Sequence, residues 1–367
     1  MAMPISSAHF RKTVTGPILG RTLPNALSLL KRLDGITGFV TVAGLDRDNR
    51  SAVFGRSHHN VERVARISHT LAKQFIAAGR TDIDIDRVTR LAVLHDVNRL
   101  PFAHNGEKAA NFNQAENMRE YLKRNELELA EEEIQDLIAI LNKDIKSMSS
   151  SARVVFAADT ADGYIEDPLL AITALGVSAE FVPKDVAARV GLPFGDAVFS
   201  AKLSLLRALY EARRPEEYTE TFNMLVFEYA TKFLDANNDG TTLFIEIDGY
   251  GATKKALREG FMNKQVFPIN NGIASKNKKL QKDIVKPMMA SLIAEFGTEE
   301  EAHFVMLKWT DQDMLDQAVA RGIISEDRKA DYYPLLDNLQ RTAERYGAIK
   351  SRNPVRGLWH GFLRLFD

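Results

Sequence analysis

The amino-acid sequence predicts a mainly α-helical protein with a few short strands. Most of the 367 residues follow the helical repeat of apolar side chains, and strand-like alternation is confined to short segments. Apolar residues make up 45% of the chain and charged residues 26%, which is typical of a globular protein and excludes wholesale disorder. A chain of this length can also bury a substantial core.

Successive apolar stripes predict the helices of the first half. The first stripe consists of Val61, Val64, Ala65, Leu71, Ala72 and Phe75. Asp84 can cap the next helix, whose inner face carries Ile85, Val88, Leu91 and Ala92. A long acidic helix follows, with a stripe formed by Leu129, Ile134, Leu137, Ile138 and Leu141. Serines at 147–151 then start a helix through Val154, Val155 and Ala158.

Strands are expected at residues 38–42 and 243–247, where apolar and polar residues alternate beside turns. A soft break lies at 182–195, and its apolar content favours a loop between helices over a domain linker. We therefore expect a core at residues 1–195 and a mainly helical C-terminal region at 196–367, either separate or part of the same domain.

Charge and cysteine content exclude several classes of function. With 48 basic and 49 acidic residues the net charge is -1, so no global basic field drives nucleic-acid binding, although a local patch remains compatible. The absence of cysteine excludes disulfides, iron–sulfur clusters and thiol nucleophiles. No apolar run is long enough for a transmembrane helix, and residues 1–14 lack a signal-peptide core. We expect a cytoplasmic protein that does not use a membrane.

The string LAVLHDVNRLPFAHNGE, residues 91–107, carries the candidate chemistry. His95 continues the buried face of its helix, and Asp96 follows it directly. A buried His beside a buried Asp needs compensation, which a metal ion supplies. These ligands suit Mn, Mg, Co, Fe, Ni or Zn. A capping Asp beside a structural His is the alternative interpretation, so the flanking helices matter: His59 begins an upstream helix, and Asp159 lies on a downstream helical stripe.

This pattern resembles the HD phosphohydrolase superfamily, and the run from His95 is similar to the HD-x-x-H-x-P-F-x-H-x-G-E segment of its dGTP triphosphohydrolase family. The matching positions are His95, Asp96, Pro101, Phe102, His104, Gly106 and Glu107. HNVE from His59 resembles the family's H-S-L-E, and Thr37-Gly38-Phe39-Val40 after Arg32-Leu33 resembles its R-L…T-Q-V. The resemblance covers roughly residues 30–170.

The resemblance implies an HD-domain helical bundle with one divalent metal held by His59, His95, Asp96 and Asp159. His58 competes for the first position, but only His59 keeps the family's offset from Arg56 and Glu62. The implied reaction hydrolyses a deoxynucleoside triphosphate to deoxynucleoside and inorganic triphosphate. Relatives form oligomers, so a homo-oligomer between dimer and hexamer is expected.

Further residues receive roles from the same comparison. His104 and Glu107, spaced i, i+3, share a helix face and suit general acid–base work. Arg56, Arg99 and Lys108 are candidates for phosphate binding, and Tyr164 and Asp167 for sugar binding. Two departures stand out: Arg99 replaces a family His, and Gly38 replaces a sugar-contacting Gln. They keep two alternatives open: another HD phosphohydrolase acting on nucleoside monophosphates or signalling nucleotides, and a non-catalytic nucleotide-binding regulator.

Two other segments suggest binding. DANNDGTTLFIE fits the EF-hand pattern, so a calcium site is one hypothesis and a polar turn leading into a strand is the other. Its candidate ligands are Asp235, Asn237, Asp239, Thr241 and Glu246. The tail at 350–367 combines basic and aromatic residues, which favours a terminal helix docked on its own core or on another subunit, with membrane or nucleic acid as the alternatives.

Overall fold

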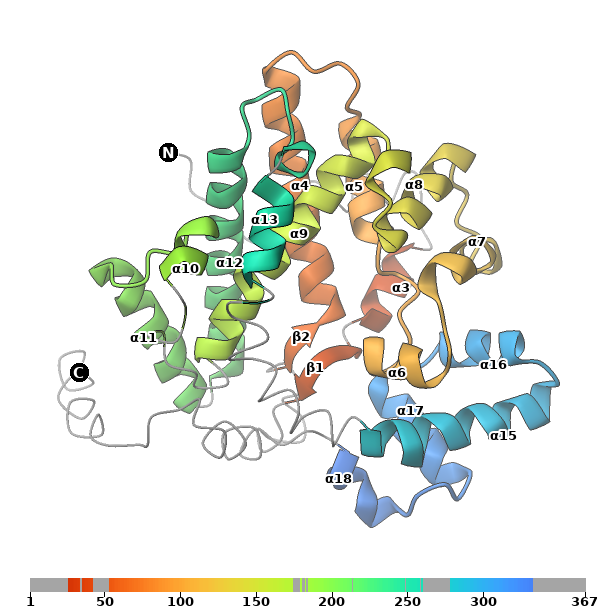
Figure 1. The fold of residues 1–367 in the computed structure, drawn as a ribbon. Helices are drawn as coiled ribbons and strands as arrows, with labels where there is room; N and C mark the ends of the chain where they lie inside the picture. Colours follow the sequence, from red (N-terminus) through yellow and green to blue (C-terminus); the bar gives the residue numbers. More distant parts are fainter. Residues whose placement is uncertain are drawn as a thin grey trace.

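The structure is a computed structural model, and it is mainly α-helical as predicted (Figure 1). It describes residues 26–33, 35–41, 53–173, 184–212, 214–247, 249–257 and 278–332, together with Ala179, Val182 and Glu259. The tail at 350–367 and part of the 182–195 break lie outside the described residues. No helix in the described part of the chain is both long enough and apolar enough to cross a membrane.

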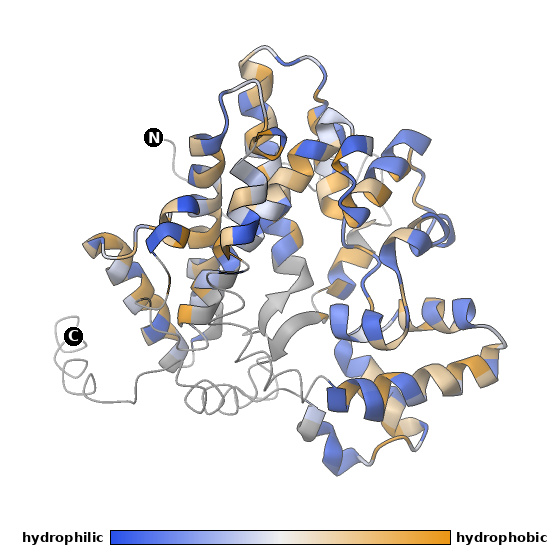
Figure 2. Ribbon diagram, viewed as in Figure 1, coloured by the Kyte–Doolittle hydropathy of each residue, from blue (hydrophilic) through white to orange (hydrophobic). Residues whose placement is uncertain are grey.

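Three helices form the centre of the fold. They are α4 (Ser57–Ala77), α5 (Ile85–Leu94) and α9 (Ser150–Thr173), and each of them packs against the other two. Their predicted inner faces are buried: Val64, Leu91 and Val155 are at most 1% exposed. Figure 2 shows apolar residues along these central helices, whereas α7 (Gln114–Arg124) is mostly hydrophilic. The helical repeat therefore predicted the core correctly.

Local signals set the helix boundaries. The Asp84 side chain accepts hydrogen bonds from the backbone N–H groups of Asp86 and Arg87, which confirms the predicted cap of α5. The serine cluster precedes α9 as expected. Helix α8 (Glu131–Asn142) begins after Leu129, so this residue of the predicted stripe lies outside the helix, although it still packs against the core.

The two strand predictions have different outcomes. Residues 38–41 are confirmed within β1 (Thr37–Thr41), whereas Val42 lies outside the described residues. Strand β1 pairs antiparallel with β2 (Val53–Arg56), a strand that the sequence did not predict. The segment 243–247 is not a strand, because Phe244–Glu246 form the short 3₁₀ helix η4. Its consecutive residues Leu243, Phe244 and Ile245 are all buried, so the core takes them as a compact turn instead of burying only one face of a strand.

The C-terminal half contributes two groups of helices. One group packs against α9 and consists of α11 (Ala197–Glu211) and α12 (Pro215–Asn237), and α12 also contacts α4. The second group lies beside α6 (His104–Ala109), as Figure 1 shows, and consists of η6 (Gln281–Val285), α15 (Lys286–Phe296), α16 (Glu299–Met306) and α17 (Asp311–Ala320). The division at residues 195/196 stays a prediction.

The remaining described helices are short. They are α3 (Ala26–Leu33), η2 (Ile145–Ser147), α10 (Lys184–Arg189), α13 (Gly249–Ala256), η7 (Glu326–Arg328) and α18 (Lys329–Tyr332). Helix α3 packs against α4, and α10 packs against α13.

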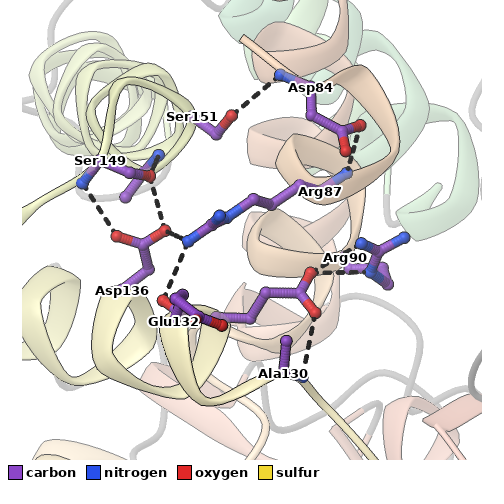
Figure 3. A network of polar contacts seen from close by, with 10 residues as sticks. Asp84, Arg87, Arg90, Ala130, Glu132, Asp136, Ser149 and Ser151 are labelled. Carbon is purple, nitrogen blue, oxygen red and sulfur yellow. Dashed lines mark hydrogen bonds and ion pairs between the residues drawn. The ribbon is translucent and has the colours of Figure 1, made fainter. Parts of the chain in front are cut away.

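A network of polar contacts joins α5, α8 and the start of α9 (Figure 3). Asp136 of α8 is 3% exposed and accepts hydrogen bonds from the Ser149 N–H at 2.9 Å and the Ser149 hydroxyl at 2.6 Å. Its other partner is the Arg87 guanidinium. One buried carboxylate therefore holds three segments in register, and its partners would lose their acceptor without it.

We predict that Asp136→Ala lowers the free energy of unfolding by about 2–3 kcal/mol, because Ser149 and Arg87 lose their shared acceptor. Urea denaturation followed by circular dichroism measures this change. Arg119→Ala is the matched control, because Arg119 and its partner Glu131 are 49% and 56% exposed, and this variant should unfold almost as the wild type does. An equal loss in both variants would contradict the prediction.

Candidate metal and phosphohydrolase site

His95 lies at the centre of the candidate site. It is the C-terminal cap of α5 and is 3% exposed. Its Nδ1–H donates to the carbonyl oxygen of Ala92 at 2.7 Å, so Nε2 carries the lone pair. Nε2 is buried and has no hydrogen-bond partner among the described residues. An imidazole held in this tautomer with a buried free nitrogen is ready to coordinate a metal.

Two carboxylates face that nitrogen. Asp96 Oδ2 lies 3.5 Å from His95 Nε2, and Asp159 Oδ1 of α9 lies 3.7 Å from it. The structure thus brings together three of the four predicted ligands from two helices. Within the described part of the chain, however, no three side chains converge closely enough to hold a metal ion. The donor chemistry of nitrogen and carboxylate oxygen nevertheless fits a divalent cation.

The two carboxylates have different electrostatic surroundings. Burial alone would raise the pKa of Asp96, but the charge and hydrogen bond of Arg99, together with the neighbouring histidines, outweigh burial and hold that pKa at about 2. Burial raises the pKa of Asp159, and the neighbouring carboxylates Asp96 and Asp162 raise it further. Asp159 therefore lacks a close cationic partner of the kind that Asp96 has, and a bound cation would supply one.

The predicted acid–base pair is formed. His104 and Glu107 lie in α6, and His104 Nδ1 donates to Glu107 Oε2 at 2.8 Å. The side chain of His104 is 74% exposed, whereas that of Glu107 is 9% exposed. The buried carboxylate therefore orients a largely exposed imidazole through its Nδ1.

Arg99 connects this pair with the metal ligands. Its Nη2 donates to Asp96 Oδ2 at 2.5 Å, and its Nη1 donates to His104 Nε2 at 3.1 Å. The side chain that replaces the family's His is therefore part of the site. It places a positive charge between His95-Asp96 and His104.

The other predicted residues have varied positions. His58 and His59 lie in the first turn of α4, but their side chains fall outside the described residues, as do those of Arg56 and Asp167. The backbone of Arg56 pairs with Thr37, which places the Thr37–Val40 segment beside the start of α4. The Tyr164 hydroxyl is buried without a hydrogen-bond partner in the described structure, and burial raises its pKa. Lys108 is exposed on α6.

The sequence interpretation missed a buried ionic cluster next to Asp159. Arg63 of α4 donates from Nε to Asp162 Oδ1 at 2.7 Å and from Nη2 to Glu166 Oε1 at 2.7 Å. Its Nη1 donates to Asn223 Oδ1 of α12 at 2.8 Å. Burial alone would lower the pKa of Arg63, but the two carboxylates raise it well above its usual value. The i, i+3, i+7 spacing of Asp159, Asp162 and Glu166 was the signal that could have revealed the cluster.

The segment that fits the EF-hand pattern contacts arginines elsewhere in the chain. The five predicted ligands are Asp235, Asn237, Asp239, Thr241 and Glu246. Glu246 Oε1 accepts from Arg153 Nη1 at 2.6 Å, and the Thr241 carbonyl accepts from the Arg80 guanidinium. Asn237 lies within helix α12 instead of an open loop. Protein donors therefore occupy two of the five predicted ligands, which favours the polar turn, and the calcium site stays a hypothesis. The polar turn leads into the 3₁₀ helix η4 and not into a strand.

Gly106 explains part of the motif. A Cβ atom at this position would lie 1.9 Å from the carbonyl oxygen of Pro101, so the backbone of α6 approaches the preceding turn too closely for any side chain. Two of the four residues between them, Phe102 and Ala103, have positive φ angles of 62° and 45°. The glycine of the Pro-Phe-x-His-x-Gly pattern is therefore needed for the close approach of the backbone, in addition to the chemical role predicted for the histidine.

We predict that Gly106→Ala lowers the free energy of unfolding by about 1–3 kcal/mol, because α6 must move away from Pro101. Thermal unfolding measures this loss. Gly163→Ala is the matched control, because a Cβ at this helical position meets nothing within 4 Å. The control should be neutral or stabilised by up to about 1 kcal/mol. Equal melting temperatures for the two variants would contradict the prediction.

A family comparison agrees with this geometry. Residues 58–163 match the family model described as HD domain. No curated protein matches the chain. The matched range runs from the start of α4 to α9 and includes the predicted ligands, His104 and Glu107. HD domains bind a divalent metal ion and are in general phosphohydrolases. Residues 58–163 of this chain are therefore an HD domain, which indicates metal-dependent phosphohydrolase activity.

Proposed function

We propose that this protein hydrolyses deoxynucleoside triphosphates to deoxynucleoside and inorganic triphosphate. The observation that carries the proposal is the buried, unpartnered Nε2 of His95 facing Asp96 and Asp159, next to the His104–Glu107 pair. A metal ligand set beside a cation and an acid–base pair suits attack on a phosphoryl group. The resemblance of residues 95–107 to the triphosphohydrolase family supports the choice of substrate class.

The metal ligands would be His95, Asp96, Asp159 and, from the first turn of α4, His59. A divalent ion bound there supplies Lewis-acid polarisation of the phosphoryl oxygen. The chain provides a negatively charged surrounding for such an ion: besides Asp96 and Asp159, it places the buried Asp162 and the partly buried Glu166 there, and both form ion pairs with Arg63. The ionic cluster thus favours cation binding at Asp159.

His104 is the proposed general acid–base. Its Nδ1–H bond to Glu107 leaves Nε2 as the nitrogen that exchanges protons with the substrate. In the reaction, water attacks the α-phosphorus and the bond to the 5′-oxygen breaks. His104 can deliver a proton to that oxygen, which leaves as the deoxynucleoside hydroxyl, and Glu107 stabilises the imidazolium form.

The substrate contacts are proposed from charge and position. Arg99 already lies between Asp96 and His104, where it can neutralise a phosphate oxygen. Arg56 and Lys108 would add positive charge for the remaining phosphates. The buried Tyr164 hydroxyl without a partner suits a sugar hydroxyl, and Asp167 is proposed to accept from the same group.

One observation favours a second candidate, a non-catalytic nucleotide-binding regulator. Arg99 Nη2 lies 2.5 Å from Asp96 Oδ2, so a cation of the protein itself occupies one predicted metal ligand. If that ion pair persists when nucleotide binds, the site would hold phosphate without an ion. Metal binding and turnover therefore need to be measured separately.

We predict that Mn²⁺ at about a hundred times its Kd stabilises the protein by about 2.7 kcal/mol. His95→Ala should abolish this stabilisation, because it removes the buried donor nitrogen. Thermal unfolding with and without Mn²⁺ measures the effect, and isothermal titration gives the stoichiometry. His69→Ala is the matched control, because His69 lies in α4 near Thr89, and it should keep the response. A full Mn²⁺ response in His95→Ala would contradict the assignment.

We predict that the purified protein with Mn²⁺, Mg²⁺ or Co²⁺ converts at least one dNTP to deoxynucleoside and intact triphosphate. Chromatography of the products from all dNTPs and NTPs tests this. Asp96→Ala should abolish turnover. His104→Ala should reduce kcat by about 10²–10⁴-fold while the Mn²⁺ stabilisation remains, because it removes only the acid–base group.

Other products would identify the alternatives. Orthophosphate with a nucleoside diphosphate or monophosphate would contradict triphosphate release and favour another HD phosphohydrolase, as would turnover of nucleoside monophosphates or signalling nucleotides. Nucleotide binding without any product would favour the regulator. The His69→Ala control should keep wild-type turnover.

A further inference from the structure

The segment that precedes His104 has an unusual backbone. Phe102 and Ala103 follow each other with φ angles of 62° and 45°, a region that residues with a Cβ rarely adopt. Both side chains are buried, at 7% and 0% exposure. The turn runs directly into α6, so its conformation sets the direction in which His104 leaves the core. Surrounding contacts must hold such a turn in place.

One carboxylate from the far end of the chain makes that contact. The backbone N–H of Phe102 donates to Asp311 Oδ1 at 2.6 Å, across a sequence separation of 209 residues. Asp311 is 5% exposed at the first turn of α17. A buried backbone N–H needs an acceptor, and the Asp311 carboxylate supplies it. This hydrogen bond is therefore made by Phe102, one of the two residues with a positive φ angle.

Asp311 is itself fixed by its neighbours. Its backbone N–H donates to the carbonyl oxygen of Gly35 at 2.9 Å. A Cβ at Gly35 would lie 2.5 Å from Thr310 Cγ2, so the chain before β1 lies directly against the start of α17. Thr310 and Asp313 form a capping box at the same helix end. The contact with the Gly35 segment, which does not involve Asp313, thus fixes the backbone that carries the Asp311 carboxylate.

The same group of helices holds the other end of α6. His303 of α16 is 5% exposed, and its Nε2–H donates to the carbonyl oxygen of Ala110, the C-terminal cap of α6, at 2.7 Å. Its ring also meets that of Phe112 edge to face at 5.1 Å between centroids. Contacts from α16 and α17 therefore bracket the short helix that carries His104 and Glu107, as the positions of these helices in Figure 1 indicate.

We propose that Asp311 is a positioning residue for His104: its carboxylate holds the left-handed turn at Phe102–Ala103 and thereby orients the acid–base pair of α6. This inference rests on the proposed function of His104 and extends the site beyond the HD domain, into helix α17. The hydrogen bonds that the structure describes for Asp311 include those to Phe102 and to Gly35, which lie outside the predicted ligand set. The loss of Asp311 should therefore affect the proton-transfer step and leave metal binding unchanged.

The test compares Asp311→Ala, Asp311→Asn and Asp313→Ala in the full chain. Steady-state kinetics on the hydrolysed dNTP give kcat and KM, and hydrogen exchange with mass spectrometry gives the protection of residues 100–110. Asp311→Ala should lower kcat by about 10²-fold with little change in KM, because His104 is displaced. It should also speed exchange at 102–107. Asp311→Asn keeps a carbonyl oxygen but no charge, so both readouts should lie between those of wild type and Asp311→Ala.

Asp313→Ala is the matched control, because it removes the cap of the same helix without touching Phe102. It should keep wild-type kcat and wild-type protection at 102–107. Unchanged kcat or unchanged exchange in Asp311→Ala would overturn the inference, and so would equal losses in Asp313→Ala. If Asp311→Ala does not fold, Asp311→Asn decides by the same two readouts. If the wild type hydrolyses no nucleotide, the proposed function fails, and exchange alone decides whether Asp311 holds the turn.

Discussion

The row of acidic groups along one face of α9 is the constraint on which the rest of the site depends. Asp162 is fully buried, and the side chains of Asp159 and Glu166, on the neighbouring turns, are 36% and 15% exposed. Carboxylates in such a place need cations. Arg63 of α4 forms ion pairs with Asp162 and Glu166 of α9. These ion pairs connect the two helices that carry the predicted ligands His59 and Asp159. The same pair of helices, α4 and α9, thus carries both the ion pairs of Arg63 and two of the predicted metal ligands.

Two side chains of different chemistry, His95 and Arg99, lie next to Asp96. On one side, His95 offers a nitrogen without a proton, and on the other Arg99 offers a permanent positive charge. A carboxylate with a pKa of about 2 stays ionised throughout the physiological pH range. It can therefore pair with Arg99 or bind a cation together with His95. Arg99 therefore places a permanent positive charge beside two of the predicted ligands, His95 and Asp96.

Sequence patterns were sufficient for the parts of the fold that depend on local order. The helical repeat located α4, α5 and α9, and Asp84 marked the start of α5. Fixed spacing also placed His104 beside Glu107. These features involve residues within a few positions of each other, where periodicity is informative. The relation of His95 to Asp159 needed the family pattern, because two separate helices supply them.

Contacts between residues far apart in the sequence, such as strand pairs and hydrogen bonds to polar side chains, were not predictable from periodicity. Strand β2 exists because β1 offers it a partner, and the segment around Phe244 is a turn because the core buries three consecutive residues. The EF-hand pattern also gave no sign that Arg80 and Arg153, distant in sequence, donate to two of its oxygen atoms. The spacing of apolar residues does not predict such partners, because each contact depends on which surfaces the fold brings together.

The hydrogen bond from Phe102 to Asp311 has a consequence for the order of events during synthesis. The chain emerges from its N-terminus, so α4, α5 and α9 can pack together well before residue 311 is made. Until α17 arrives, nothing holds the Phe102 N–H, and the turn before His104 is free to relax toward ordinary backbone angles. Closing a contact over this separation also costs chain entropy that early helical contacts do not. The part of the site that follows His95 and Asp96 therefore matures last, when the C-terminal helices dock.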